Sequence, residues 1–305
     1  MTTYPGEHQP LKTQQSSITE LELVQEAKIR SLLGDPPEKR FEASGVCVHE
    51  DSCYVIFDNV SHLARFVLDR SQLSATHQML PLHNPFAGYE DIAFDPREKR
   101  FFLLIEAQKF KPGRYQARIE EYDHELNFLT TQWANFPFQH KNKGLEGLAC
   151  VYLDERFYLL GLCEGNRCRA GITGRTPGKG RIQVFERNHK AWKHIKTLKL
   201  PKTLPFEDYA SLDVMGARIA VVSQASSLLW VGTFKNRQGD FVDAGRVYRF
   251  PYKHKHKTVY CNIEGIAWLA PDLILTVSDK HKSGKQAKRC KHKDQSLHIF
   301  RIPET

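Results

Sequence analysis

A short motif that recurs five times constrains this sequence more than any other feature. Each copy has an apolar or aromatic residue, a glutamate, two further residues and then alanine or glycine. The copies are FEASGV, YEDIAF, LEGLAC, FEDYAS and IEGIAW, with the glutamates Glu42, Glu90, Glu146, Glu207 and Glu264. Successive glutamates are 48, 56, 61 and 57 residues apart. A local pattern that returns at this spacing is typical of a solenoid or a β-propeller.

The stretches between the motifs read as strands. In the third copy the segments EGLACVYL, FYLLGLCEGN, RIQVFER and KHIKTLKL alternate with polar or Gly-rich turns, which is the content of a four-stranded blade. The last copy lacks a fourth strand, whereas a strand-like segment at residues 19–29 precedes the first copy. We therefore predict an all-β, five-bladed β-propeller of four-stranded blades, closed by the N-terminal strand, because closure hides the open edges. An open solenoid is the alternative, but the short tails leave no room for caps.

Length and composition fit one large domain. We expect a flexible tail at residues 1–17 and a single propeller domain at residues 18–305, with blades starting near residues 42, 90, 146, 207 and 264. The N-terminus has no basic region followed by an apolar run, so neither a secretory signal nor a membrane partner is expected. The seven cysteines are odd in number and make no CxxC pair, which predicts free thiols and a cytoplasmic location.

The glutamates predict a charged ring. The small residue of each motif suits an inner strand, where side chains crowd around the axis; these residues are Gly45, Ala93, Ala149, Ala210 and Ala267. All five glutamates would then point toward one central opening, where like charges repel unless a cation, a proton or a basic side chain intervenes. Each glutamate could instead bond backbone N–H groups or pair with a nearby Lys or Arg.

A second polar layer follows the second strand of each copy. Its candidates are Asp58, Glu106, Glu164, Asn166, Gln224 and Asp279. In a propeller these residues open on the same face as the glutamates. Carboxylate and amide oxygens in two layers fit calcium best, with magnesium or manganese as alternatives.

Much of the formal charge of +9 lies in the loops that come next, at residues 109–118, 167–181 and 280–293. Basic loops around an acidic centre favour an anionic small-molecule ligand, for which Arg167, Arg181 and Lys280 would supply positive charge. No GxxxxGK[ST], GxSxG or HExxH motif is present. His62, His83 and His140 are further candidates for a general base. The basic loops could instead bind an acidic protein or nucleic acid, although they lack interleaved aromatic residues.

Two stretches, LEGLACVYLDERFYLLGLCEGN and NIEGIAWLAPDLILTVSDK, resemble propeller families related to the "esterase-like activity of phytase" proteins, in which an E-G-[ILV]-A inner strand recurs. The repeat layout more distantly resembles the calcium-activated nucleotidases (apyrases), which are five-bladed and hold a central calcium with acidic side chains. That resemblance implies metal contacts, direct or through water, at the five motif glutamates.

The sequence thus predicts a calcium-type site that binds a phosphorylated or other anionic molecule. The expected metal ligands are Glu42, Glu90, Glu146, Glu207, Glu264 and Asp279. If the protein is an enzyme, we expect a metal-dependent phosphoric-ester or ester hydrolase in which Glu146 and Glu164 are catalytic. The expected substrate-binding residues are Asp58, Glu106, Asn166, Arg167, Arg181, Gln224 and Lys280. The alternative is a non-catalytic interaction module.

Overall fold

Strands make up most of the regular structure in the described part of the chain. The computed structural model describes residues 18–34, 36–69, 72–86, 88–140, 143–235, 240–241, 243–253, 257–280 and 287–304. The predicted flexible tail at residues 1–17 lies outside these ranges. The helical segments within them are short: α1 (Ile29–Leu32), η1 (Asn166–Cys168), α2 (Gly171–Arg175) and η3 (Lys288–Lys293). The chain is therefore all-β, as the alternating segments predict.

The strands pair mainly with their neighbours in sequence. One sheet contains β3 (Ala43–His49), β4 (Ser52–Phe57), β5 (His62–Asp69) and β6 (Gln72–Pro81). A larger sheet contains β7 (Tyr89–Asp95), β8 (Arg100–Lys111), β9 (Arg114–Asp123), β10 (Phe128–Asn135), β11 (Leu145–Leu153), β12 (Arg156–Cys163), β13 (Arg181–Arg187) and β14 (Ala191–Lys199). It is continuous because β10 and β14 pair in parallel across the junction of two antiparallel groups.

Two of the remaining sheets take their outer strands from the N-terminal segment. One contains β15 (Ser211–Met215), β16 (Arg218–Ser223), β17 (Leu228–Lys235), β18 (Asp240–Phe241), β19 (Arg246–Arg249) and β1 (Thr19–Glu20). Another contains β22 (Ile263–Ala270), β23 (Leu273–Ser278), β24 (Ser296–Arg301) and β2 (Glu22–Lys28). A two-stranded pair, β20 (Tyr252–Lys253) and β21 (Lys257–Thr258), lies apart. The strand expected at residues 19–29 is thus split into β1 and β2, and Ile29 begins α1 instead.

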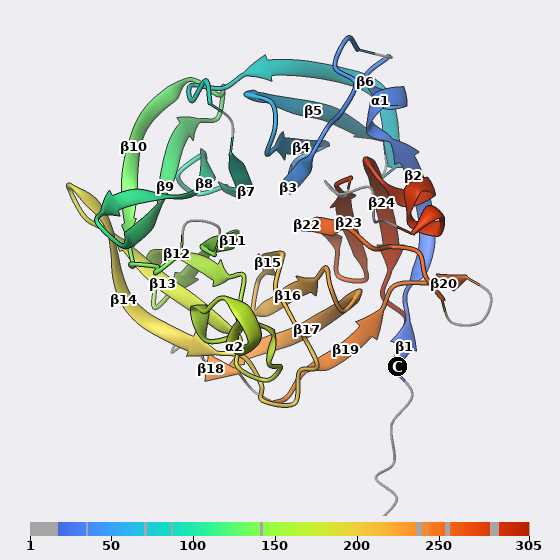
Figure 1. The fold of residues 1–305 in the computed structure, drawn as a ribbon. Coiled ribbons are helices and arrows are strands. Elements are labelled where there is room, and N and C mark those ends of the chain that lie inside the picture. Colours follow the sequence, from blue (N-terminus) through green and yellow to red (C-terminus); the bar gives the residue numbers. More distant parts are fainter. Residues whose placement is uncertain are drawn as a thin grey trace, which may run out of the picture.

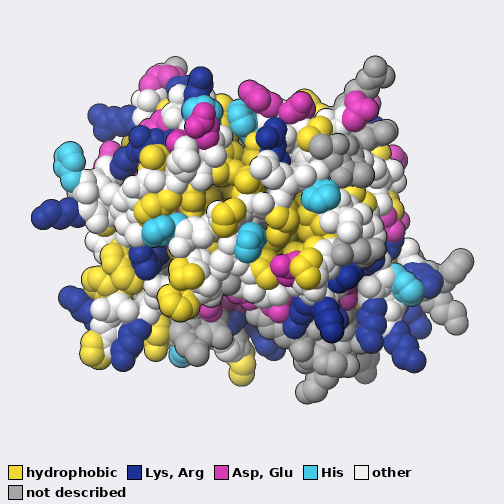
Figure 2. All heavy atoms as spheres, turned by 90° about the horizontal axis from the view of Figure 1, so that it is seen from above, with side chains coloured by type: hydrophobic (Ala, Val, Ile, Leu, Met, Phe, Trp, Pro, Cys, Tyr) yellow, Lys and Arg dark blue, Asp and Glu magenta, His cyan; other side chains and the backbone are white. Residues whose placement is uncertain are grey.

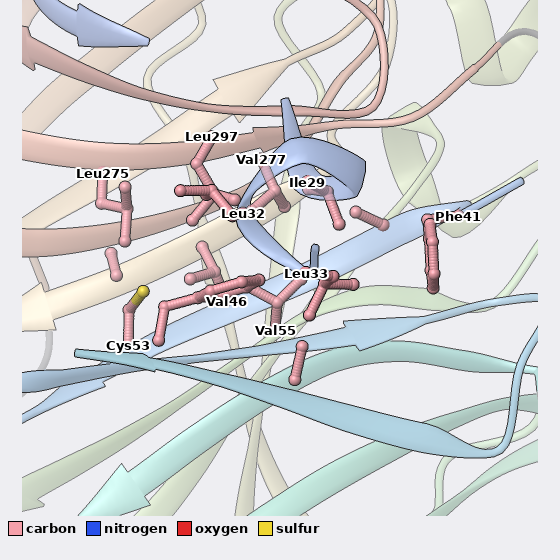
Figure 3. Packing of buried hydrophobic residues seen from close by; sticks show 14 of the residues in the cluster. Ile29, Leu32, Leu33, Phe41, Val46, Cys53, Val55, Leu275, Val277 and Leu297 are labelled. Carbon is pink, nitrogen blue, oxygen red and sulfur yellow. The ribbon is translucent and has the colours of Figure 1, made fainter. Parts of the chain in front are cut away.

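Figure 1 shows these groups arranged around a central axis, with β3, β7, β11, β15 and β22 innermost. Apolar side chains fill the spaces between adjacent groups. Between the sheets of β3 and β22, for example, Ile29 and Leu33 pack with Val46, Val55 and Leu297 (Figure 3). Burial of such side chains stabilises the fold by about 25 cal/mol per Å² of apolar surface. The packing fixes the inner strands, whose ends surround the site described below.

Two disulfides contradict the expectation that all cysteines are free thiols. Cys163 is bonded to Cys168 and Cys261 to Cys290, whereas Cys47, Cys53 and Cys150 are free. The first pair forms because the chain turns back through η1 directly after β12. Disulfides are typical of oxidising compartments, so the basis for expecting a cytoplasmic location is lost. In the described ranges, no helix has the length and apolar character needed to cross a bilayer.

Candidate functional site

The inner strands surround a central cavity of about 410 Å³. Carboxyl groups dominate its lining. The residues are Glu42, Ala43, Ser44, Asp58, Glu90, Glu106, Glu146, Glu164, Asp208, Tyr209, Ala210, Gln224, Glu264 and Asp279. Nine of these are acidic, and none of the described lining residues is Lys, Arg or His.

The predicted polar layer after each second strand lines this cavity at five equivalent positions. The register shows the equivalence, because each side chain lies two residues beyond a residue that pairs with an inner strand. The pairs are Gly45 with Ile56, Asp91 with Leu104, Gly147 with Leu162, Ser211 with Val222 and Gly265 with Val277. The lining residues that follow are Asp58, Glu106, Glu164, Gln224 and Asp279.

The glutamates of the motif are less regular. Glu90, Glu146 and Glu264 each occupy a β-bulge, where the register shifts between the residue before and the residue after the glutamate. A bulge leaves one residue unpaired and redirects its side chain, and bulges are frequent beside functional sites. In the sheet of β3 the bulge residue is Ser44. Three glutamates therefore share one structural position, and the other two do not.

Glu207 was predicted to be a metal ligand, but the structure places it outside the cavity. Its side chain is exposed, while its backbone N–H donates to Ser226 Oγ at 3.1 Å. Asp208 lines the cavity instead. The motif aligns Ala210 with Ala93, whereas in the structure Ala210 lies directly before Ser211, the counterpart of Asp91. The only sequence signal for Asp208 is the acidic doublet itself.

Glu42 also lies away from the bulge position, directly before β3, yet it lines the cavity. It is 7% exposed, and its Oε1 lies 3.0 Å from Arg40 Nε. Glu42 stands two residues before the bulge residue Ser44, and Asp208 stands two residues before Ala210, which directly precedes Ser211.

Four residues predicted to bind substrate do not line the central cavity. Asn166 is fully buried, and its Nδ2 donates to the carbonyls of Gly174 and Phe206 at 3.0 and 3.1 Å. It therefore holds the loop after β12 in place. Arg167 is exposed, and Arg181 donates to backbone carbonyls in the same loop. Lys280 is exposed and lines a different cavity.

Positive and hydrogen-bond-donating groups contact part of the acidic lining. Arg40 pairs with Glu42, and Lys143 Nζ pairs with Glu164 Oε1. Gln224 Nε2 donates to Glu264 Oε1. The other oxygen of Glu164, Oε2, is buried and has no hydrogen-bond partner among the described residues. A buried acceptor without a donor costs about 1–3 kcal/mol, so a cation or donor bound beside Glu164 Oε2 would be stabilising.

The carboxyl groups hold protons more tightly than usual. Burial, and then the neighbouring Asp58 and Glu106, raise the pKa of Glu90 to about 8. Burial and Glu90 raise the pKa of Glu146 well above its usual range, and Glu90 and Glu146 share a hydrogen bond. Burial and Asp279 raise the pKa of Glu264 in the same way. The side chains of Glu90, Glu146 and Glu264 line the cavity, but other parts of the protein cover most of their surface.

Two aspartates of the inner strands, Asp91 on β7 and Asp213 on β15, do not line the cavity and have a different environment. Asp91 Oδ1 accepts from the N–H of Ile92, and its Oδ2 accepts from the N–H of Leu148 and from Ser211 Oγ, all at 2.9 Å. Asp213 Oδ2 accepts from the N–H of Trp268 at 2.8 Å. These aspartates bridge neighbouring inner strands, and hydrogen bonds within the chain satisfy them.

The cavity supplies donors suited to a hard cation. Calcium takes six to eight oxygen ligands, and the described lining offers mainly carboxylate oxygens, with amide and hydroxyl oxygens besides. Glu164 Oε2 adds an acceptor without a partner. No group of three or more His, Cys, Asp or Glu side chains in the described ranges is already drawn together as metal ligands. The chemistry of the lining therefore fits a cation, and binding would require its long side chains to move inward.

Comparisons with known proteins identify the fold. No family model matches the chain, and no curated protein matches its sequence. The glutaminyl cyclase of Myxococcus xanthus is similar in structure, with 12% identity, coverage of 93% of this chain and 97% of that chain, and a TM-score of 0.53. A calcium-binding protein, regucalcin from Agrobacterium tumefaciens, has 7% identity, coverage of 93% and 95%, and a TM-score of 0.47. Aldose sugar dehydrogenase from Streptomyces coelicolor, solved with PQQ bound, has 8% identity, coverage of 91% and 98%, and a TM-score of 0.46. The first likeness, together with the sheet order, identifies a β-propeller fold and nothing finer.

Proposed function

We propose that this chain is a five-bladed β-propeller whose central cavity binds a calcium-type cation and, together with it, an anionic small molecule. The blade count is supported by the inner strands β3, β7, β11, β15 and β22, each of which begins one antiparallel group. In this proposal the domain extends from residue 18 to the end of the chain, and β2 completes the last blade beside β24.

The observation that carries the proposal is the gathering of nine acidic side chains around a cavity of about 410 Å³. Like charges at this density are tolerated only if protons or cations neutralise them. Glu90, Glu146, Glu264 and Asp279 are the ligands we assign first, with Glu42 and Asp208 at the margin. Flexible glutamates favour calcium over magnesium or manganese, because magnesium requires a near-ideal octahedron.

An anionic ligand follows from the same site. A bound cation polarises a phosphoryl or ester oxygen and lowers the pKa of a water molecule beside it. Among the chain's own residues, Glu164 is placed to accept a proton, because its Oε2 is buried at the cavity without a hydrogen-bond partner. Glu146 lies on β11, the strand that pairs with β12 just before Glu164. We assign these two glutamates to catalysis in a phosphoric-ester or ester hydrolase.

Isothermal titration calorimetry of the EDTA-treated protein with calcium, magnesium and manganese tests the cation site. Calcium should bind tightest, and Glu146→Gln should weaken calcium binding at least about tenfold through loss of a charged ligand. The matched control is Glu207→Gln, which alters an exposed glutamate of the same motif and should leave the affinity unchanged. No binding of any of the three cations, or equal losses in both variants, would contradict the proposal.

Hydrolysis has a separate test, because a cation site can exist without turnover. A chromogenic phosphate monoester should be cleaved in calcium but not in EDTA. Glu164→Gln should abolish cleavage while retaining most of the calcium affinity. Normal calcium binding without any cleavage would leave a binding protein and remove the assignment of Glu164.

A further inference from the structure

A second cavity, also of about 410 Å³, lies between α1, η3 and the segment before β3. Its character is opposite to that of the central cavity. It is lined by Lys28, Arg30, Ser31, Lys39, Lys280, Lys291, Asp294 and Gln295.

Positive charge dominates this basic cavity. Its one acidic lining residue, Asp294, is 5% exposed, and its Oδ1 accepts from Asn262 Nδ2 at 2.9 Å. Lys39, Lys280 and Lys291 are exposed, and among the described residues none of the three forms an ion pair. Figure 2 shows that Lys and Arg side chains also gather along the lower edge of the molecule in that view. The cavity is therefore a hollow with a strong positive field rather than an isolated surface lysine.

Packing and covalent bonds hold the walls of the basic cavity. Ile29 and Leu32 of α1 are buried in the apolar cluster of Figure 3. Gln295 joins two further segments, since its carbonyl accepts from the N–H of Ile29 and its Oε1 from the N–H of Phe41, both at 2.9 Å. The Cys261–Cys290 disulfide fixes η3, which carries Lys291. A site whose charged groups are held in place loses less entropy when a ligand binds.

One lysine of the cavity is partly removed from water. Lys28 is half-buried, and its Nζ donates to the carbonyl of Asp294. Burial is the largest cause that lowers the pKa of Lys28, whereas the carboxyl groups of Asp294 and Glu26 act in the opposite direction. An anion in the cavity would likewise stabilise the charged form of this lysine.

We propose that the basic cavity is a second binding site, separate from the central one, for a phosphate-type anion: inorganic phosphate, a short polyphosphate or the phosphoryl group of a larger molecule. Phosphate offers several acceptor oxygens and two negative charges, which match convergent lysines and an arginine better than a carboxylate does. The volume lies within the range of small-molecule sites. The two cavities share wall segments, because Lys280 follows Asp279 and Lys39 precedes Glu42 by three residues.

Calorimetry of the full chain in EDTA with inorganic phosphate, pyrophosphate and glycerol phosphate tests this site independently of any cation. Pyrophosphate should bind best, and Lys39→Gln with Lys291→Gln should weaken its binding at least tenfold. The control pair, Lys193→Gln with Lys199→Gln, removes the same charge from exposed positions of β14 and should change binding less than twofold. Thermal unfolding without ligand should be equal in both pairs, which excludes misfolding.

Comparison of these soluble probes with vesicles that contain phosphatidic acid shows whether the site prefers a soluble phosphate or a lipid phosphate. Binding to either that is lost with the Lys39 and Lys291 pair supports the site and shows whether soluble or lipid phosphate is preferred. Absence of binding at millimolar probe, equal losses in the control pair, or binding only to a mixed-sequence oligonucleotide would overturn the proposal. Failure of calcium binding at the central cavity would not affect this result.

Discussion

Glu90 and Asp91 are neighbours on β7, yet their carboxyl groups have opposite surroundings. Asp91 is 1% exposed and accepts hydrogen bonds from Ile92, Leu148 and Ser211. Glu90 occupies a bulge and faces a cavity lined by eight other acidic side chains. The difference teaches that a buried carboxyl group is structural where backbone donors satisfy it, and available for ligands where other acids surround it.

Asp213 on β15 and Asp208, just before this strand, show the same contrast between a hydrogen-bonded carboxyl group and one that lines the cavity. Asp213 accepts from the N–H groups of Val214 and Trp268 and so connects β15 to β22. Asp208 lines the cavity, where Ser223 Oγ and the N–H of Ala225 donate to it. Asp208 is thus intermediate, partly satisfied and partly open to a ligand. Substitution of a carboxyl group that hydrogen bonds satisfy should therefore lower stability, whereas substitution of one that lines the cavity should weaken cation binding.

The largest effect is expected from Asp91→Ala. This change leaves the buried N–H groups of Ile92 and Leu148 without acceptors, which should lower the free energy of unfolding by about 3 kcal/mol. Glu90→Gln replaces a carboxyl group that must take up a proton on folding by a neutral amide, so in EDTA it should leave stability unchanged or raise it slightly. Urea unfolding in EDTA measures both. An equal loss of unfolding free energy in Asp91→Ala and Glu90→Gln would contradict the distinction between hydrogen-bonded and cavity-lining carboxyl groups.

A change of pH should have a smaller effect on the free energy of unfolding. In EDTA, Glu90 keeps its proton in the folded protein up to about pH 8, whereas the unfolded chain releases it near pH ~4.3. The folded state therefore binds more protons in this interval, and the free energy of unfolding should fall as pH rises. Allowing for screening by water in the cavity, we expect a loss of about 1 kcal/mol between pH 6.5 and 8.5.

That window is chosen because His298 acts in the opposite direction at lower pH. Burial lowers the pKa of His298, so its contribution to stability is lost as pH falls below its usual value of roughly 6.5. Urea unfolding across pH 6.5 to 8.5 should show a shallower decline for Glu90→Gln than for the unmodified chain. An identical slope would mean that Glu90 does not retain its proton.

The smallest effect is expected from Asp208→Asn. Because Ser223 and Ala225 already donate to this carboxyl group, its loss should weaken calcium binding only about threefold, or ~0.7 kcal/mol. Calorimetry with calcium measures the change. A loss as large as that of Glu146→Gln would show that Asp208 is a principal ligand.

The sequence contained enough information to predict the all-β class and much of the site. The spacing of the motif predicts the inner strands, and the polar residues after the second strands meet at one cavity because hairpin pairing keeps their register constant. Asp58, Glu106, Glu164 and Asp279 were located in this way. The strand before the first motif pairs with β24, where the missing strand was expected.

The remaining features depend on geometry that a motif does not encode. In the fourth copy the motif is displaced along the chain, because Ala210 rather than Glu207 directly precedes Ser211, the counterpart of Asp91. Spacing alone therefore could not distinguish Glu207 from Asp208. Asn166 looked like a ligand because it is polar and close to Glu164, but it satisfies backbone groups of its own loop. The Cys163–Cys168 disulfide arises from a turn that brings the two residues together, and nothing in their spacing indicates this.

The most direct test of the account is the number of protons released when calcium binds. Calorimetry at pH 7 in two buffers with different heats of ionisation measures this number. Because Glu90 and its neighbours hold protons that a cation must displace, about one proton or more should leave per calcium at pH 7, and fewer at pH 9.5, where Glu90 has already lost its proton. No calcium binding, or a heat of binding that is equal in both buffers at pH 7, would contradict the claim that the cavity exchanges protons for a cation.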